Sequence, residues 1–340
     1  MKALALFFAI SLLALPASAE KVTPLFASLD PIDITITGPV TRIIQKAASS
    51  TDPLPATLTI GEETHSIELS ARGNSRRRPE ACTFPPLRVR LSAAPPEGSL
   101  FRKQKALKLV THCRAQKAFQ QHTLLEYAAY RMYNEVTEAS FRVRLANVRY
   151  VDSGSGKLVA EKPGFFIEDA DDVAARNGLK ELEAGALAID QHDAAAAARA
   201  VLFFHMIANH DWSMLAGPEG GCCHNGKLLG ASKTTTAGLT YLPYDFDYSG
   251  FVDTPYAAPP DDFGISSVKT RHYRGACALN AAVTAAAPQF RARRAAIEEA
   301  IRTTPGLDRK SVDRAVKFLD GFYDDIEDEA AIAKLVKRCR

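Results

Sequence analysis

Hydrophobic and polar residues alternate in several short runs between positions 32 and 110. In the first run, Ile32, Ile34 and Ile36 alternate with polar residues, so the isoleucines share one face of a strand. Breaks rich in proline or glycine, at 52–55 and 95–98, separate the runs. The pattern predicts a twisted, largely antiparallel sheet with strands at 32–37, 56–60, 66–71, 87–91 and 106–110.

A helical period replaces this alternation at 121–135. Leu124, Leu125 and neighbouring alanines fall on one helical face there, which predicts a single helix after the first strands. Two further runs, 141–151 and 157–167, predict a strand pair, because a turn rich in glycine and serine joins them.

Beyond Asp169 the helical period dominates the pattern. It predicts helices at 170–176, 193–209, 288–302, 310–323 and 329–336. We therefore expect an α+β chain in which a strand-rich part at 20–168 carries one helix and a mainly helical part at 169–340 follows it.

The first residues are typical of a secretory signal peptide. Lys2 precedes an apolar run at 3–15, Pro16 breaks this run, and small residues end at Ala19, where signal peptidase would cut. We expect cleavage near Ala19 and a periplasmic or secreted protein. No membrane span is expected after cleavage, because the apolar run is too short and is removed. An uncleaved anchor is the alternative interpretation of this segment.

The charge balance argues against one class of partner. The 340 residues include 42 Lys plus Arg and 39 Asp plus Glu, which gives a formal net charge of +3. A dedicated nucleic-acid binder needs many cations to neutralise phosphates at once. We therefore expect no nucleic-acid partner, and a phosphate site would have to be local.

The chain has six cysteines, an even number that predicts disulfides in an exported protein. Cys82 and Cys113 flank two predicted strands and are the favoured pair, while the other pairings stay open. Cys222 and Cys223, followed by His224, raise the alternative of a metal site. They have neither the C-x-x-C spacing nor a partner cluster, so disulfides are favoured over zinc.

Acidic and amide side chains recur in the helical part of the chain. Asp211 follows a predicted buried helix, Asn225 lies further along, and Asp245 and Asp247 stand among apolar residues. Phosphoryl transfer needs such a set, because one carboxylate orients the attacking hydroxyl while Asn and Asp oxygens hold magnesium against the phosphates. The alternative is structural, with these residues capping turns and flanking a hairpin.

A cation for the phosphates is also needed. Lys108 alternates with apolar neighbours on a predicted strand, so its ammonium could face a cleft and pair with phosphates and with a helix carboxylate such as Glu126. The alternative for Lys108 is a solvated strand face, and three other cations compete with it for the role: Lys105, Arg88 and Arg90.

An arginine-rich turn follows the third predicted strand. It contains Arg72, Gly73 and Ser75 and three further arginines at 76–78. A glycine-bearing turn lets backbone N–H groups approach an anion, and guanidinium groups bind phosphate bidentately. The turn therefore predicts a nucleotide or acidic-substrate contact through Arg72 and Ser75, with an exposed basic turn as the alternative.

The order of these features resembles the spore-coat-protein-H (CotH) type of atypical kinase. The resemblance covers about 69–256 and includes Arg-Gly-Asn-Ser at 72–75, Gly-Phe-Phe-Ile-Glu at 164–168 and Pro-Tyr-Asp-Phe-Asp at 243–247. It implies a two-lobed protein-kinase-like fold, with an N-terminal antiparallel sheet lobe, a C-terminal helical lobe and a nucleotide between them.

The resemblance also implies roles for single residues. Asp211 would be the catalytic-loop acid, Asn225, Asp245 and Asp247 would bind Mg²⁺ or Mn²⁺, and Glu168 would contact the nucleotide. One departure from the family pattern is the long segment between Asp211 and Asn225, which contains the adjacent cysteines.

The expected function is that of an exported, nucleotide- and magnesium-dependent phosphotransferase. ATP or another nucleotide would be the donor, and the acceptor would be a hydroxyl of a protein or a small molecule. Two alternatives stay open: a catalytically inactive kinase-like binding module, and a metal-dependent hydrolase.

Overall fold

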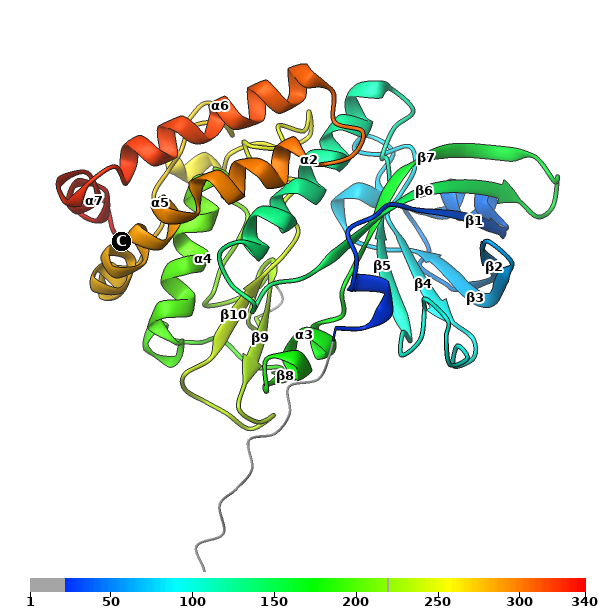
Figure 1. Cartoon of the computed structure of the whole chain (residues 1–340), viewed down its shortest axis with the longest axis horizontal. Helices are drawn as coiled ribbons and strands as arrows, with labels where there is room; N and C mark the ends of the chain where they lie inside the picture. The colour runs from blue at the N-terminus through cyan, green and yellow to red at the C-terminus, as the bar shows by residue number, and fades with distance from the viewer. Residues whose placement is uncertain (1–21, 219) are drawn as a thin grey trace, which may run out of the picture.

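The structure is a computed structural model that describes residues 22–218 and 220–340. Seven strands close into a barrel in the order β1-β2-β3-β4-β5-β7-β6. Figure 1 shows the barrel beside a group of helices. The strands are β1 (Ile32–Gly38), β2 (Leu54–Ile60), β3 (Glu63–Ala71), β4 (Leu87–Leu91), β5 (Ala106–Val110), β6 (Val143–Asp152) and β7 (Leu158–Ile167).

The pairing of β1 with β6 closes the barrel. These strands run parallel, from Ile32 opposite Ala146 to Gly38 opposite Asp152, whereas the other barrel pairs are antiparallel. The predicted two-lobed kinase-like fold with an N-terminal antiparallel sheet lobe is therefore wrong. Alternation marks a strand and its buried face, but it does not say that the first strand returns to one more than a hundred residues later.

Side chains fill the interior of the barrel. The predicted alternation of β1 is confirmed, because Ile32, Ile34 and Ile36 are buried. They pack in one apolar cluster with residues of the other barrel strands, including Leu69 of β3 and Phe166 of β7. The barrel is thus a packed core, and the candidate site lies outside it.

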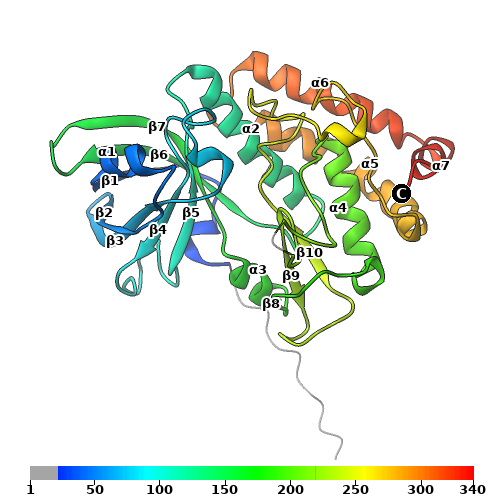
Figure 2. The same ribbon diagram turned by 180° about the vertical axis from the view of Figure 1, so that it is seen from behind.

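Seven α-helices lie in the described residues, and the five predicted helical segments after Asp169 are confirmed. The longest of them begins earlier than predicted, so that Pro288 lies inside it. Figure 2, seen from behind, again shows the second helix between the barrel and the other long helices. The helices are α1 (Val40–Lys46), α2 (Lys117–Asn134), α3 (Ala170–Arg176), α4 (Ala194–Met206), α5 (Asn280–Arg302), α6 (Arg309–Asp325) and α7 (Glu329–Val336).

A second, small sheet was not predicted. It consists of β8 (Lys180–Leu182), β9 (Gly226–Gly230) and β10 (Thr240–Pro243), in the antiparallel order β10-β9-β8. Because β9 and β10 are antiparallel, with Gly226 opposite Pro243, the residues before β9 and after β10 meet at one end of the sheet.

Three disulfides support the described part of the chain. The predicted Cys82–Cys113 bridge is confirmed, and the other pairs are Cys222–Cys223 and Cys277–Cys339. Such bridges fit an extracellular or periplasmic protein. None of the helices in residues 22–218 and 220–340 combines the length and apolar character that crossing a membrane requires. The predicted signal peptide at 1–19 lies outside the described residues.

Candidate functional site

Asp245 follows β10 and lies at the centre of the candidate site. Its backbone has a left-handed conformation, with φ of 65°, and its N–H donates to the Tyr130 hydroxyl of α2 at 2.9 Å. The preceding residue, Tyr244, donates its N–H to the carbonyl of Asn225 at 3.1 Å. The pairing of β9 with β10 thus places Asn225 and Asp245, which are distant in sequence, at the same end of the small sheet.

Asn225 also contacts Asp211, which lies just beyond α4. Its Nδ2 donates to Asp211 Oδ2 at 2.9 Å and to the Asp211 carbonyl at 2.6 Å. His224 Nε2 lies 2.6 Å from Asp211 Oδ1. The long segment after Asp211 folds back through reciprocal backbone hydrogen bonds between Ser213 and His224, at 3.1 and 3.0 Å. The departure from the family spacing is therefore a loop that returns Asn225 to Asp211.

Arg76 is a site residue that sequence reasoning missed. It lies in a 3-10 turn, η2 (Ser75–Arg77), and its guanidinium is buried among three carboxylates. The distances are 3.0 Å from Nη1 to Glu126 Oε2, 2.7 Å from Nη2 to Asp245 Oδ1 and 3.3 Å from Nε to Asp247 Oδ2. Glu126 of α2 therefore pairs with Arg76 and not, as expected, with Lys108.

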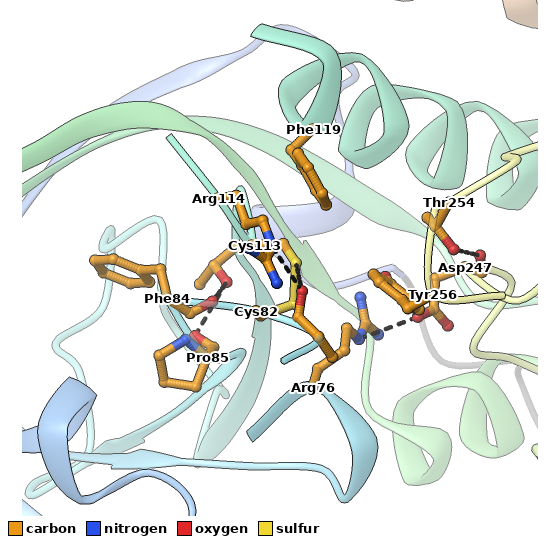
Figure 3. Close-up of a disulfide and its surroundings, with 12 residues drawn as sticks. Arg76, Cys82, Phe84, Pro85, Cys113, Arg114, Phe119, Asp247, Thr254 and Tyr256 are labelled. Atoms are coloured by element: carbon orange, nitrogen blue, oxygen red, sulfur yellow. Dashed lines mark hydrogen bonds and ion pairs between the residues drawn. A yellow bond between two sulfur atoms is a disulfide. The ribbon is translucent and has the colours of Figure 1, made fainter. Parts of the chain in front are cut away.

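The Cys82–Cys113 disulfide lies beside this turn. Cys82 donates its N–H to the carbonyl of Arg78 at 3.0 Å, and Cys113 follows β5. Figure 3 shows Arg76 extending from the turn beside the disulfide toward Asp247 and Tyr256. The bridge thus ties the arginine-rich turn to the end of a barrel strand.

The buried side chain of Asp247 contacts other residues of the protein. Its Oδ2 contacts Arg76 and also accepts a hydrogen bond from the Tyr256 hydroxyl at 2.9 Å. Burial raises the pKa of Asp247 to about 8, although the Arg76 guanidinium opposes this shift. Burial also raises the pKa of Glu126. Of the two aspartates predicted to bind metal, Asp245 is the open one, with 31% of its side chain exposed against 5% for Asp247.

Two partly buried cations near Asp245 have no carboxylate partner within ion-pair distance among the described residues. Lys108 of β5 lies over the Tyr244 ring, with Nζ 4.7 Å from the ring centroid, and burial lowers its pKa to about 8. Arg72 has its Nε and Nη2 atoms buried without a hydrogen-bond partner in the described chain. Burial lowers the pKa of Arg72, and the nearby Asp245 opposes this shift. Positive charge that is partly withdrawn from water and has no carboxylate partner is unfavourable, so this arrangement is complementary to an anion.

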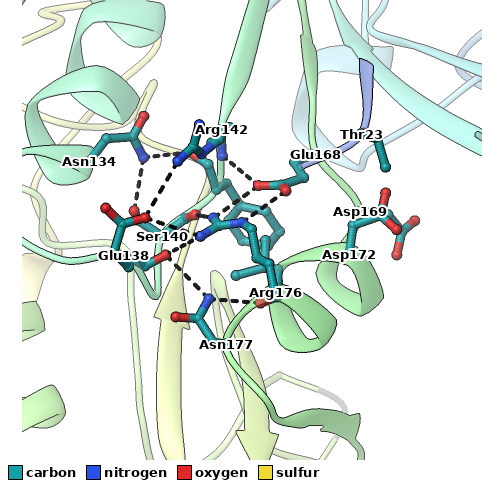
Figure 4. Close-up of polar contacts among 12 residues, drawn as sticks. Thr23, Asn134, Glu138, Ser140, Arg142, Glu168, Asp169, Asp172, Arg176 and Asn177 are labelled. Atoms are coloured by element: carbon teal, nitrogen blue, oxygen red, sulfur yellow. Dashed lines mark hydrogen bonds and ion pairs between the residues drawn. The ribbon is translucent and has the colours of Figure 1, made fainter. Parts of the chain in front are cut away.

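Glu168 lies elsewhere, in a polar network at the end of β7. It is 1% exposed, and its Oε1 lies 3.1 Å from Nε of Arg176 in α3. Its Oε2 accepts from Arg176 Nη2 at 3.1 Å and from the backbone N–H of Arg142 at 2.9 Å. Figure 4 shows Glu168 enclosed by these partners. Both carboxylate oxygens are thus engaged in joining β7, α3 and the segment before β6.

Ser75 lies close to the Arg76 cluster. It begins the η2 turn, directly before Arg76, and its hydroxyl lies near the Tyr248 side chain. The structure therefore brings together Asp211, Asn225, Asp245, Asp247, Arg72 and Lys108, with Ser75 at the edge of this group, and it keeps Glu168 apart from them.

Comparisons with known proteins add little to this geometry. No protein-family model matches the chain, and no curated protein matches it in sequence. A solved structure that resembles it is the proinflammatory kinase CtkA of Helicobacter pylori, at 8% identity and a TM-score of 0.39, covering 85% of this chain and 93% of CtkA. CtkA is itself a kinase, and the comparison does not reach the CotH family. Because the TM-score is below 0.5, the likeness assigns neither a fold nor a function to this chain.

Proposed function

We propose that this protein is a nucleotide- and metal-dependent phosphotransferase. The observation that carries the proposal is the pair of partly buried cations, Arg72 and Lys108, which lie beside Asp245 without a carboxylate partner within ion-pair distance in the described chain. Guanidinium and ammonium groups in a partly desolvated site bind phosphate strongly, and the phosphates would supply the negative charge that the two cations lack. ATP or another nucleoside triphosphate is the proposed donor.

The oxygen atoms near these cations fit Mg²⁺ or Mn²⁺. The contact of Asp245 with Arg76 uses Oδ1, and the hydrogen bonds from Asn225 to Asp211 use Nδ2. Among the described residues, Asp245 Oδ2 and Asn225 Oδ1 therefore accept no hydrogen bond and are available to a metal ion. Carboxylate and amide oxygens are hard ligands, and Mg²⁺ in nucleotide sites takes one or two protein ligands together with phosphates and water. Asp245 and Asn225 would hold such an ion, which would neutralise charge on the transferred phosphoryl group. Asp247 was expected as a further ligand, but its contacts with Arg76 and Tyr256 leave it turned inward.

Asp211 is the proposed partner of the acceptor. Its carboxylate is 41% exposed, so a hydroxyl group from a protein or a small molecule could reach it. The hydroxyl oxygen would form a new bond to the terminal phosphorus, and the bond from this phosphorus to the bridging oxygen would break. The hydroxyl proton would pass to Asp211 and the nucleoside diphosphate would leave.

The first experiment follows the thermal stability of the purified protein with nucleotide, with Mn²⁺ or Mg²⁺, and with both. A panel of nucleoside triphosphates identifies the donor, because a ligand that binds only the folded state raises the melting temperature. We expect a shift that needs both nucleotide and metal. The absence of a shift under all conditions would refute the proposal.

Variants connect this shift to the two cations. Arg72→Met and Lys108→Met are each expected to weaken nucleotide affinity about 10- to 100-fold, the value of a charge-assisted hydrogen bond. Arg149→Met is the matched control, because Arg149 lies in an exposed ion pair with Glu161 on the barrel.

Radiolabelled nucleotide then separates the alternative functions. Transfer of label to an acceptor supports a phosphotransferase. Release of free phosphate without an acceptor supports a hydrolase, and nucleotide binding without turnover supports a binding module.

A further inference from the structure

The Asp211 carboxylate is held by a donor on each of its two oxygens. His224 Nε2 contacts Oδ1 at 2.6 Å, and Asn225 Nδ2 donates to Oδ2 at 2.9 Å. The two donors are consecutive residues on one returning loop. An aspartate that is 41% exposed would otherwise be free to rotate about its side-chain torsions.

Tyr241 holds the loop that carries the two donors, and Asn209 holds the backbone of Asp211. The Tyr241 hydroxyl, on buried β10, lies 2.8 Å from the carbonyl oxygens of both His224 and Asn225. On the other side, the backbone N–H of Asp211 donates to Asn209 Oδ1 at 2.8 Å. The donors and the carboxylate are therefore each anchored in the packed part of the molecule.

We propose that His224 is a positioning residue for phosphoryl transfer, which donates from Nε2 to Asp211 Oδ1 and fixes the orientation of this carboxylate toward the acceptor hydroxyl. The role rests on the proposed function. Asn225 alone cannot supply it, because one donor on Oδ2 leaves the opposite oxygen free to swing. A proton acceptor displaced by about 1 Å reduces the rate of an enzyme about 100-fold, so this orientation has consequences for turnover.

The exposure of His224 argues that its contact with Asp211 serves catalysis and does not stabilise the fold. Its side chain is 30% exposed and pairs with a carboxylate that is also partly exposed. An ion pair or hydrogen bond in such a setting adds little to the stability of the fold. Removal of the donor should therefore change catalysis and leave folding and nucleotide binding intact.

The experiment uses the full chain and two substitutions of the same residue. His224→Phe keeps a planar ring but has no donor, whereas His224→Gln keeps an N–H donor near the position of Nε2. We expect kcat to fall about 100-fold in His224→Phe, with the KM for nucleotide and the nucleotide-dependent thermal shift unchanged. His224→Gln should recover most of the rate.

A double-mutant cycle tests whether the effect passes through Asp211. In the Asp211→Asn background, adding His224→Phe should cost no further rate, because the oriented carboxylate is already absent. The inference is overturned if His224→Phe keeps its kcat, if His224→Gln is as slow as His224→Phe, or if the two losses multiply. A wild-type protein that binds nucleotide in the thermal assay but never transfers phosphate would instead refute the proposed function, and the role of His224 with it.

Discussion

Arg76 and Glu126 form a buried ion pair that joins the turn after β3 to helix α2, with 3.0 Å between Nη1 and Oε2. The same guanidinium contacts Asp245 and Asp247, so one cation serves three carboxylates. The pairing of Glu126 with Arg76 has a consequence for Lys108, which was expected to pair with Glu126. Because Glu126 is already paired, Lys108 is left without a carboxylate partner within ion-pair distance in the described chain and is available to an anion.

Replacement of Arg76 is expected to destabilise the fold strongly. Arg76→Met removes the only guanidinium that contacts all three carboxylates in the described structure, and breaking a buried pair in this way lowers the free energy of unfolding by about 3 to 5 kcal/mol. Urea denaturation measures this loss. In the control, Arg149→Met, the exposed pair with Glu161 contributes no more than about 1 kcal/mol. Equal losses in the two variants would contradict the central place of Arg76.

The sequence resolves local structure better than it resolves pairing. The strand pattern located all seven barrel strands, β1 to β7, and the helical period located α3 and α7 with their observed bounds. The pairing of Ile32 with Ala146 and the contact of Arg76 with Glu126 both join segments far apart in the chain. Neither contact can be predicted from the hydrophobic pattern, because the period shows only which face of a strand or helix is buried.

Among the site residues too, the sequence identifies candidates by local chemistry but does not show which residues meet in the fold. Asp211, Asn225 and Asp245 could be proposed from their chemistry and their order in the chain. His224 was noticed only as a neighbour of cysteines, and Arg76 stands among several arginines that the sequence does not distinguish. What separates Arg76 from Arg77 is burial, which depends on the η2 turn and on the position of α2.

Glu168 gives a test of an expectation carried over from the family. Glu168→Gln removes the negative charge opposite buried Arg176 and is expected to lower the free energy of unfolding by about 3 kcal/mol. The nucleotide-dependent thermal shift should be unchanged, because both oxygens of Glu168 face Arg176 and the backbone of Arg142. Glu161→Gln, at an exposed position, is the control. Loss of nucleotide binding in a stable Glu168→Gln protein would restore the predicted nucleotide contact.

The lowered pKa of Lys108 predicts a dependence of anion binding on pH. Burial lowers this pKa from its ordinary value of 10.5 to about 8, so the free protein loses the Lys108 charge as pH rises through 8. Nucleotide affinity should therefore fall between pH 7 and pH 9 in the wild type. The Lys108→Met variant should bind weakly at both values, with a smaller change between them. Isothermal titration calorimetry measures both proteins, and parallel pH profiles would contradict the assignment.

Lys108 also makes the stability of the fold depend on pH, and here the expected change is a rise with pH, whereas nucleotide affinity falls. Between pH 8 and 10.5 the unfolded chain keeps the Lys108 proton while the folded chain has lost it. The free energy of unfolding that this residue contributes therefore rises with pH in that window. Chemical denaturation at a series of pH values should show a rise in the wild type that is absent from Lys108→Met.

Asp245 and Asp247 allow a matched test of the metal site, because both accept the same substitution and lie two residues apart. Each keeps one oxygen without a hydrogen bond within the described chain, but the Asp245 side chain is 31% exposed, whereas that of Asp247 is 5% exposed and contacts Arg76 and Tyr256. Asp245→Asn should therefore abolish the part of the nucleotide-dependent thermal shift that requires Mn²⁺.

Asp247→Asn should keep that shift. Burial already raises the pKa of Asp247, and an amide oxygen can still accept from Arg76 and from the Tyr256 hydroxyl, so the free energy of unfolding is expected to fall by about 1 kcal/mol. Mn²⁺ binding followed by electron paramagnetic resonance measures the same difference without nucleotide turnover. If the two variants lose Mn²⁺ equally, both carboxylates bind the ion, and Arg76 must leave the cluster when the metal enters.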